Sequence, residues 1–234
     1  MEIGSRRVVD LTHGIHPRMP VSIGFPRLTL NRYLDLDNGD PATVEIVQTS
    51  LHTGTHVDAP VHFLRDGSTV DELDPLALTG TALVVDVAPT ESWREVGRAD
   101  LEEWERRSGE HIGRGDIVLL RTGHSRYWAD LPDGSRYMSE PWPYLVQSSA
   151  DLLVERGVKA FGVECADPDR VDQRDLGSAT FEVHRCLLGA GIPIIENLAH
   201  LDRLPPGRID FMALTLPIRG ASASPIRALA FLPA

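Results

Sequence analysis

The segment 52–62 holds four side chains that could take part in metal or proton chemistry. It reads HTGTHVDAPVH and contains His52, His56, Asp58 and His62, although the whole chain of 234 residues has only nine histidines. Two imidazoles and a carboxylate form a ligand set of catalytic zinc sites and of other divalent-metal sites. His52, His56 and Asp58 are therefore candidate metal ligands.

Gly54 and Pro60 both weaken a helix in this segment. We therefore predict a turn at the end of the preceding strand, in which Gly54 takes a backbone conformation that other residues resist. Such a turn could direct the three candidate ligands to one point. His62 lies four residues beyond Asp58 and could serve as general acid or base without being a ligand.

Two other interpretations of this segment remain open. The four side chains could have a purely structural role, although packing alone has no use for this spacing. They could also form a closed structural metal site, although such sites usually favour cysteine. An open site differs from both, because a metal with free coordination positions can lower the pKa of a bound water to near neutrality.

A second cluster occurs near the end of the chain. A predicted helix over 180–190 places His184 on the same face as Phe181 and Leu188, so His184 should point into the core. Twelve residues after His184, Glu196 ends an apolar strand, and functional side chains tend to lie at strand ends in α/β proteins. The pair could complete the first metal's shell or bind a second metal, but the spacing alone also suits a structural role.

The elements around these clusters predict one α/β or mixed domain with a central barrel-like or sandwiched sheet and flanking helices. A chain of 234 residues suits a single large domain, which we expect to span residues 1–234. Met19 to Pro26 reads as an ordered loop. Strands are predicted over 6–13, 42–51, 81–88, 115–123, 160–164, 192–196, 209–217 and 226–232, and helices over 100–107, 144–157 and 180–190.

Composition excludes several classes of partner. The formal net charge is −11, from 23 basic and 34 acidic residues, which disfavours nucleic acid and anionic membranes. No segment resembles a signal peptide or reaches the roughly 18 apolar residues of a membrane span. The two cysteines, Cys165 and Cys186, make no disulfide framework, so we expect a cytoplasmic protein. Cys186 lies nearly opposite His184 on its helix and is excluded as a ligand, whereas Cys165 could be a reactive thiol.

The stretch HTGTHVDAPVHF resembles the H-x-G-T-H-x-D-x-P-x-H-F signature of the cyclase family, which includes bacterial kynurenine formamidase, isatin hydrolase and polyketide cyclases. The resemblance covers nearly the whole chain, through DLTHGIHPRMP, IVLLRTG, HRCLLGAGIPIIENL and SASPIRALAFL. It implies a swivelling β/β/α fold and a homodimer or a higher homo-oligomer.

The resemblance also implies roles for the candidate site residues. His52, His56 and Asp58 would bind zinc or manganese, and His62 would handle protons. His184 and Glu196 would bind a second metal, with Asp58 as the shared ligand. The chain departs from the family in the run GVECADPDRVD (162–172), which has Glu164 and Cys165 where an Asp-Thr-x-Ser-x-Asp-like run is common. His124 stands where other members often have a bulky aromatic residue.

These features lead to the hypothesis of a metal-dependent hydrolase of a small amide. Its substrate would be an aryl formamide such as N-formylkynurenine or a cyclic amide, attacked by a metal-activated water with His62 as general acid and base. One alternative is a polyketide ring cyclase that uses the metal for aldol-type chemistry, and another is a non-catalytic, metal-dependent binding protein. Phe25, Trp128 and Trp142 are candidate pocket walls, with core or interface roles equally open.

Overall fold

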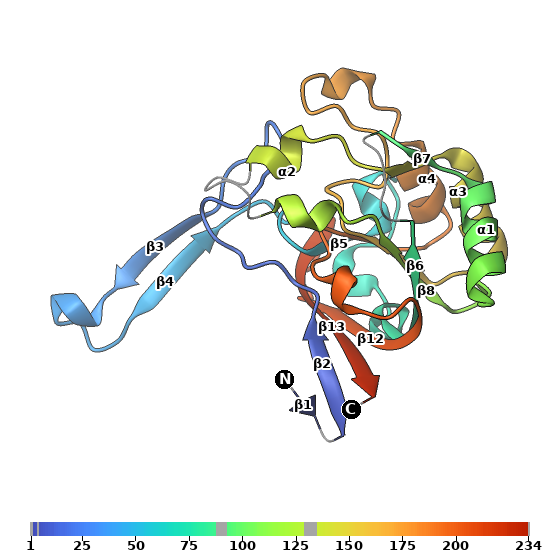
Figure 1. Cartoon of the computed structure of the whole chain (residues 1–234). Coiled ribbons are helices and arrows are strands. Elements are labelled where there is room, and N and C mark those ends of the chain that lie inside the picture. Colours follow the sequence, from blue (N-terminus) through green and yellow to red (C-terminus); the bar gives the residue numbers. More distant parts are fainter. Residues whose placement is uncertain (1, 4, 88–92, 129–134, 234) are drawn as a thin grey trace.

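A closed barrel of seven strands forms the centre of the computed structural model, which describes residues 2–3, 5–87, 93–128 and 135–233 (Figure 1). The strands of the described residues, inside and outside the barrel, are β1 (Glu2–Ile3), β2 (Arg6–Asp10), β3 (Thr29–Leu34), β4 (Val44–Gln48), β5 (His56–Asp58), β6 (Thr79–Asp86), β7 (Glu95–Val96), β8 (Ile117–Arg121), β9 (Tyr144–Leu145), β10 (Ala160–Val163), β11 (Ile194–Glu196), β12 (Gly207–Thr215) and β13 (Ala223–Pro233). The seven barrel strands follow the order β13-β12-β6-β8-β10-β11-β5 around the ring, and β5 pairs back with β13. The expected α/β class with a mixed, barrel-like sheet is confirmed.

Helices cover the parallel part of the barrel, which consists of β6, β8, β10 and β11. The helices are α1 (Arg98–Ser108), α2 (Ser135–Ser139), α3 (Gln147–Arg156) and α4 (Glu182–Gly189), and α1, α3 and α4 gather on one side of the sheet (Figure 1). Along β6, Leu83 and Val85 pack against these helices, while Ala82 and Val84 join the apolar cluster inside the barrel. Strands buried on both faces explain the continuous apolar runs in the sequence. None of the helices in the described ranges combines the length and apolar character needed to cross a bilayer.

Most of the predicted strands are present, with shifted ends. The predictions over 81–88, 115–123, 160–164, 192–196, 209–217 and 226–232 correspond to β6, β8, β10, β11, β12 and β13. Ala88, the last residue of the first of these predictions, lies outside the described residues. The first strand, predicted over 6–13, ends at Asp10, and the segment 19–26 contains no regular element, as expected.

The predicted helices begin at different residues in the structure. The helix predicted from Asp100 begins at Arg98, and the Asp100 carboxylate reaches back to accept the backbone N–H of Gly97 at 2.9 Å. Tyr144 lies in β9, which pairs with β7, so α3 begins at Gln147. Phe181, predicted to lie in the last helix, precedes it with a left-handed φ of 51°, so α4 begins at Glu182.

The strand predicted over 42–51 belongs to an arm formed by β3 and β4. Among the described residues these two strands pair only with each other, and they extend away from the barrel (Figure 1). Several large apolar side chains on the arm are exposed, including Leu30, Ile46 and Val47. A two-stranded ribbon without a covered face is at best marginally stable in water, so the arm is a candidate contact surface. Its roots lie close in sequence to the loop 20–27 and to His52.

Candidate metal centre

Strand β5 positions two of the predicted ligands on one face of the sheet. Gly54 has a φ of 68°, the left-handed conformation expected of it, and the chain then enters β5. His56 and Asp58 are two residues apart on this strand and so point to the same side, while Val57 points into the barrel. His52 lies in the bend that precedes the strand. The turn at Gly54 was predicted, but strand β5 was not.

The tertiary structure brings the second cluster to the same place. Glu196 pairs directly across from His56 in the antiparallel β5–β11 ladder. The Asp58 Oδ1 atom lies 2.8 Å from His52 Nδ1 and 3.4 Å from His56 Nε2, and Oδ2 lies 3.4 Å from His184 Nε2. The Glu196 oxygens lie 3.4 Å from His56 Nε2 and 3.3 Å from His184 Nε2. All five predicted ligands therefore surround one buried point.

The donor atoms at this point lack hydrogen-bond partners of their own. His56 Nε2 and both Asp58 oxygens are buried, and within the described ranges none of the three makes a hydrogen bond of acceptable geometry, despite the short distance to His52. Burying such polar atoms without a partner is costly. A divalent cation would satisfy all of them at once, so the residues fit a metal.

The positions of the ligand atoms allow one or two cations. Three overlapping groups have ligand atoms within 4.8 Å of one another, and they are His52/His56/Asp58, Asp58/His62/His184 and Asp167/His184/Glu196. Asp58 belongs to two of these groups, which suits a carboxylate shared between two metals. Asp167 was not singled out in the sequence, where it is one of several acidic residues in the run 162–172.

Hydrogen bonds on the far side of each imidazole set its orientation. His56 Nδ1 lies 2.8 Å from the Gly54 carbonyl oxygen, which can only accept, so Nδ1 carries a proton and Nε2 is the atom left to bind a metal. His184 Nδ1 lies 2.8 Å from Asp169 Oδ2, which leaves its Nε2 free in the same way. His52 Nε2 contacts Ser222 Oγ at 2.9 Å, so that its Nδ1 faces Asp58. Outer partners of this kind fix the tautomer of ligating histidines.

Asp169 also holds the start of helix α4 in place. Its two carboxylate oxygens accept the backbone N–H groups of Val183 and His184, at 2.9 and 3.0 Å. These groups are unpaired within the helix, so a carboxylate from another loop caps it. The sequence offered little indication of this role, because Asp169 lies in an acidic run fifteen residues before His184.

We predict that Asp169→Asn lowers metal affinity by about 10- to 100-fold, since loss of an outer-shell carboxylate typically has this effect on a ligating histidine. Isothermal titration of metal-stripped protein with zinc measures it. Asp172→Asn is the matched control, because Asp172 lies on the same loop and bonds Arg174 rather than a histidine of the centre. Equal affinities for the Asp169 variant and the unmodified protein would show that His184 needs no such partner.

The protonation of the centre reflects burial opposed by neighbouring charges. Burial disfavours charge on His56, but the Asp58 carboxylate and the charge of Glu196 outweigh it and raise the pKa of His56 to about 9. Burial and the charge of Asp58 raise the pKa of Glu196. Burial works against ionisation of Asp58, yet contacts with three histidines hold its pKa well below the usual value. These shifts favour protons on the histidine and the glutamate in the absence of a metal, and a bound cation would displace them.

His62 lies beside the centre on the short 3₁₀ turn Pro60–His62. Its ring is 3.9 Å from the ring of His52, centroid to centroid, and 6.0 Å from that of His184. Burial lowers the pKa of His62 to about 4, and the neighbouring histidines add to this against the opposing charge of Asp58. A histidine with this pKa is neutral near pH 7 and can accept a proton.

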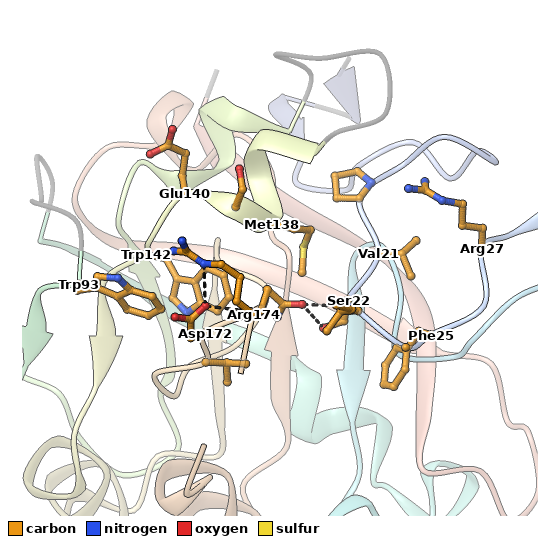
Figure 2. A pocket seen from close by; sticks show the side chains of 16 residues that line it. Val21, Ser22, Phe25, Arg27, Trp93, Met138, Glu140, Trp142, Asp172 and Arg174 are labelled. Atoms are coloured by element: carbon orange, nitrogen blue, oxygen red, sulfur yellow. Dashed lines mark hydrogen bonds and ion pairs between the residues drawn. The ribbon is translucent and has the colours of Figure 1, made fainter. Parts of the chain in front are cut away.

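Two adjoining cavities lead to the centre. The inner one has a volume of about 200 Å³ and is lined by His52, His56, His62, His184 and Glu196 together with apolar side chains. The outer one measures about 500 Å³ (Figure 2). Among the predicted aromatic walls, Phe25 lines both cavities and Trp142 lines the outer one. Trp128 lines neither of them and stacks on His13 at 3.9 Å instead.

The residues that depart from the family pattern lie behind the cavities. Glu164 is buried and accepts the backbone N–H groups of Thr122 and Gly123, so it holds a loop in place. Burial raises the pKa of the Cys165 thiol well above its usual value, and the prediction of a reactive thiol is therefore wrong. His124 is also buried, with Nε2 2.9 Å from the carbonyl oxygen of Tyr137. Later residues of the run 162–172 do line the cavities.

Known proteins resemble this chain over most of its length. The family model named Cyclase matches residues 9–170. Kynurenine formamidase from Sphingopyxis alaskensis is 31% identical over 229 residues, which is 95% of this chain and 97% of that protein. The protein of the same name from Bacillus cereus is 34% identical over 180 residues, which is 77% of this chain and 76% of the relative.

Solved structures show the same fold. Isatin hydrolase A from Labrenzia aggregata, bound to benzyl benzoate, superimposes with a TM-score of 0.87 at 28% identity, covering 98% of this chain and 95% of that one. Isatin hydrolase A from Ralstonia solanacearum gives a TM-score of 0.84 at 31% identity and covers 97% of this chain and 92% of the other. The likeness in fold thus extends over nearly the whole length of both chains.

Proposed function

Because this chain belongs to the Cyclase family and is a metal-dependent amidohydrolase, we propose that its substrate is a small amide. The substrate is either an aryl formamide such as N-formylkynurenine or a cyclic amide such as isatin. The observation that carries this proposal is the group of buried, unpartnered donor atoms on His56 and Asp58, which lies beside His62 in a cavity of about 200 Å³.

The proposed centre holds zinc or manganese, since imidazole and carboxylate ligands suit both. His52, His56 and Asp58 bind the first ion, and His184 and Glu196 bind a second where two are present, with Asp58 shared. When bound, such an ion supplies a nucleophilic water and polarises the amide carbonyl.

His62 is the proposed general acid and base. It lies next to His52 and is neutral near pH 7, so it can take a proton from the attacking water and pass it to the departing nitrogen. This second transfer matters because an amine leaves poorly without a proton. The apolar side chains Phe63 and Phe181, which line the same cavity, limit the access of bulk water.

A turnover assay tests the proposed function. Metal-stripped protein is reloaded separately with zinc and with manganese, and release of formate from N-formylkynurenine and ring opening of isatin are followed. We expect metal-dependent hydrolysis of at least one of the two amides and none by the stripped protein. Inactivity on both amides by protein shown to bind both metals would refute amide hydrolysis.

We also propose that residues 1–234 act as one domain and assemble into a homodimer or a higher homo-oligomer. The barrel uses strands from both halves of the chain, which supports a single unit. The exposed apolar side chains of the β3–β4 arm support self-association.

The free cysteines suit a location in the cytoplasm. The net charge of −11 suits a small-molecule substrate rather than nucleic acid.

The arm gives this assembly a direct test. We predict that Ile46→Glu converts the oligomer to a monomer, because it places a charge on a side chain that is 54% exposed here and buried in the assembly. Light scattering after size-exclusion chromatography measures the mass. Leu76→Glu makes the same change at an exposed leucine of the 3₁₀ turn Pro75–Leu78, outside the arm, and should leave the mass unaltered. A monomeric unmodified protein at micromolar concentration would contradict the proposal.

A further inference from the structure

The outer cavity continues directly from the metal centre. The two cavities share the loop residues 20–23 together with Phe25, Met138 and Val171 as a common wall. The inner cavity, at about 200 Å³, is the smaller of the two, and the outer one adds about 500 Å³. A substrate whose amide reaches the metal centre therefore has room for a second portion in the outer cavity.

The charged side chains of the outer cavity are not equivalent. Within the described ranges, four ionisable residues line it, and they are Arg27, Glu140, Asp172 and Arg174. Glu140 pairs with Arg136 at 3.2 Å, and Asp172 pairs with Arg174 at 3.3 Å. Arg27 has no carboxylate partner among the described residues. Its guanidinium donates one long hydrogen bond, 3.5 Å, to the carbonyl oxygen of Met19. In a chain with a net charge of −11, this cavity thus presents an unpaired cation.

The loop that carries Arg27 is tied across the cavity. The Gln173 side-chain oxygen accepts hydrogen bonds from Ser22 Oγ at 3.2 Å and from the backbone N–H of Ile23 at 3.0 Å. In Figure 2 dashed lines reach Ser22 from the other side of the cavity, and the Arg27 side chain extends from its own loop. Trp142 and Phe25 add aromatic surface on opposite sides. Arg27 is exposed and lies at the rim of a chamber whose lining combines aromatic and apolar side chains with polar ones.

We propose that the outer cavity binds an anionic side chain of the substrate and that Arg27 holds its carboxylate. The substrate class is an aryl amide whose ring bears a chain ending in a carboxylate, and this assignment rests on the amide hydrolysis proposed above. A guanidinium can bind a carboxylate through two parallel hydrogen bonds. Filling the chamber also excludes water from that pair, which strengthens it.

Steady-state kinetics of Arg27→Met test the proposal on two formamides. N-formylkynurenine carries the carboxylate, and formanilide has the same reacting group without the side chain. We expect Arg27→Met to raise KM for N-formylkynurenine about tenfold or more, as for loss of a charge-assisted hydrogen-bond pair, with little change in kcat. Hydrolysis of formanilide should be unchanged, and Arg27→Lys should restore part of the loss. Arg174→Met is the matched control, since its guanidinium already pairs with Asp172, and it should have a smaller effect.

Two outcomes would overturn the assignment, namely equal losses on both formamides in Arg27→Met, or equal kcat/KM for both in the unmodified enzyme. Inactivity on both substrates would instead refute the proposed function. In that case calorimetric binding of kynurenine to the metal-loaded protein still decides the matter. Weaker binding by Arg27→Met supports the anion site, and identical binding or none by the unmodified protein refutes it.

Discussion

Asp58→Asn is expected to remove the metal and to lower the turnover at least 100-fold. Loss of an outer-shell partner alone costs up to about 100-fold, and loss of a ligand should cost no less. The reason is the central position of this carboxylate, whose two oxygens lie within 3.4 Å of nitrogen atoms of His52, His56 and His184. An amide at this place keeps the shape and loses the negative charge that offsets the cation. Metal content after dialysis and the rate of amide hydrolysis are the two measurements.

A nearby aspartate provides the control for this change. Asp66→Asn alters an exposed carboxylate eight residues further along the chain and should keep both metal and rate. Far-ultraviolet circular dichroism of the Asp58 variant establishes that the barrel has formed. Full metal occupancy in a folded Asp58→Asn protein would exclude Asp58 as the shared ligand.

His62→Ala is expected to keep the metal and to lose roughly 10²- to 10⁴-fold in turnover, the usual contribution of a general acid or base. The ring of His62 lies tilted against that of His52, but His62 makes no contact with the Asp58 oxygens as short as those of the other three histidines. His111→Ala is the control, because His111 is an exposed histidine beside Arg156, outside the cavities. An unaffected rate would remove His62 from the mechanism.

Metal content separates the two possible roles of His62. Its ligand atom also groups with those of Asp58 and His184, so a loss of metal in His62→Ala would identify it as a ligand. The pH profile gives a second measure. Because the pKa of His62 is lowered from 6.5 to about 4, the neutral, proton-accepting form persists well below pH 6.5. The activity of the unmodified enzyme should therefore show no decline near pH 6.5 that His62→Ala abolishes.

Local features of the sequence determined how the first three ligands, His52, His56 and Asp58, come together. His52, His56 and Asp58 lie so close along the chain that one turn and one short strand suffice to converge them, and the turn depends on Gly54, whose positive φ a glycine adopts without strain. The buried strands could be predicted for a similar reason, since continuous apolar runs such as β8 reflect burial on both faces.

Contacts between distant segments determined the remaining ligands, their outer partners and the substrate cavity. The β5–β11 ladder places Glu196 opposite His56, and a short strand such as β5 has too few residues for an alternating pattern to reveal it. Asp169 orients His184 from another loop, and Arg27 faces a cavity because Gln173 ties its loop across the rim. The sequence by itself therefore determined the chemistry of the ligands, whereas the tertiary structure decided their outer partners and the shape of the substrate site, because those contacts join segments that no local pattern relates.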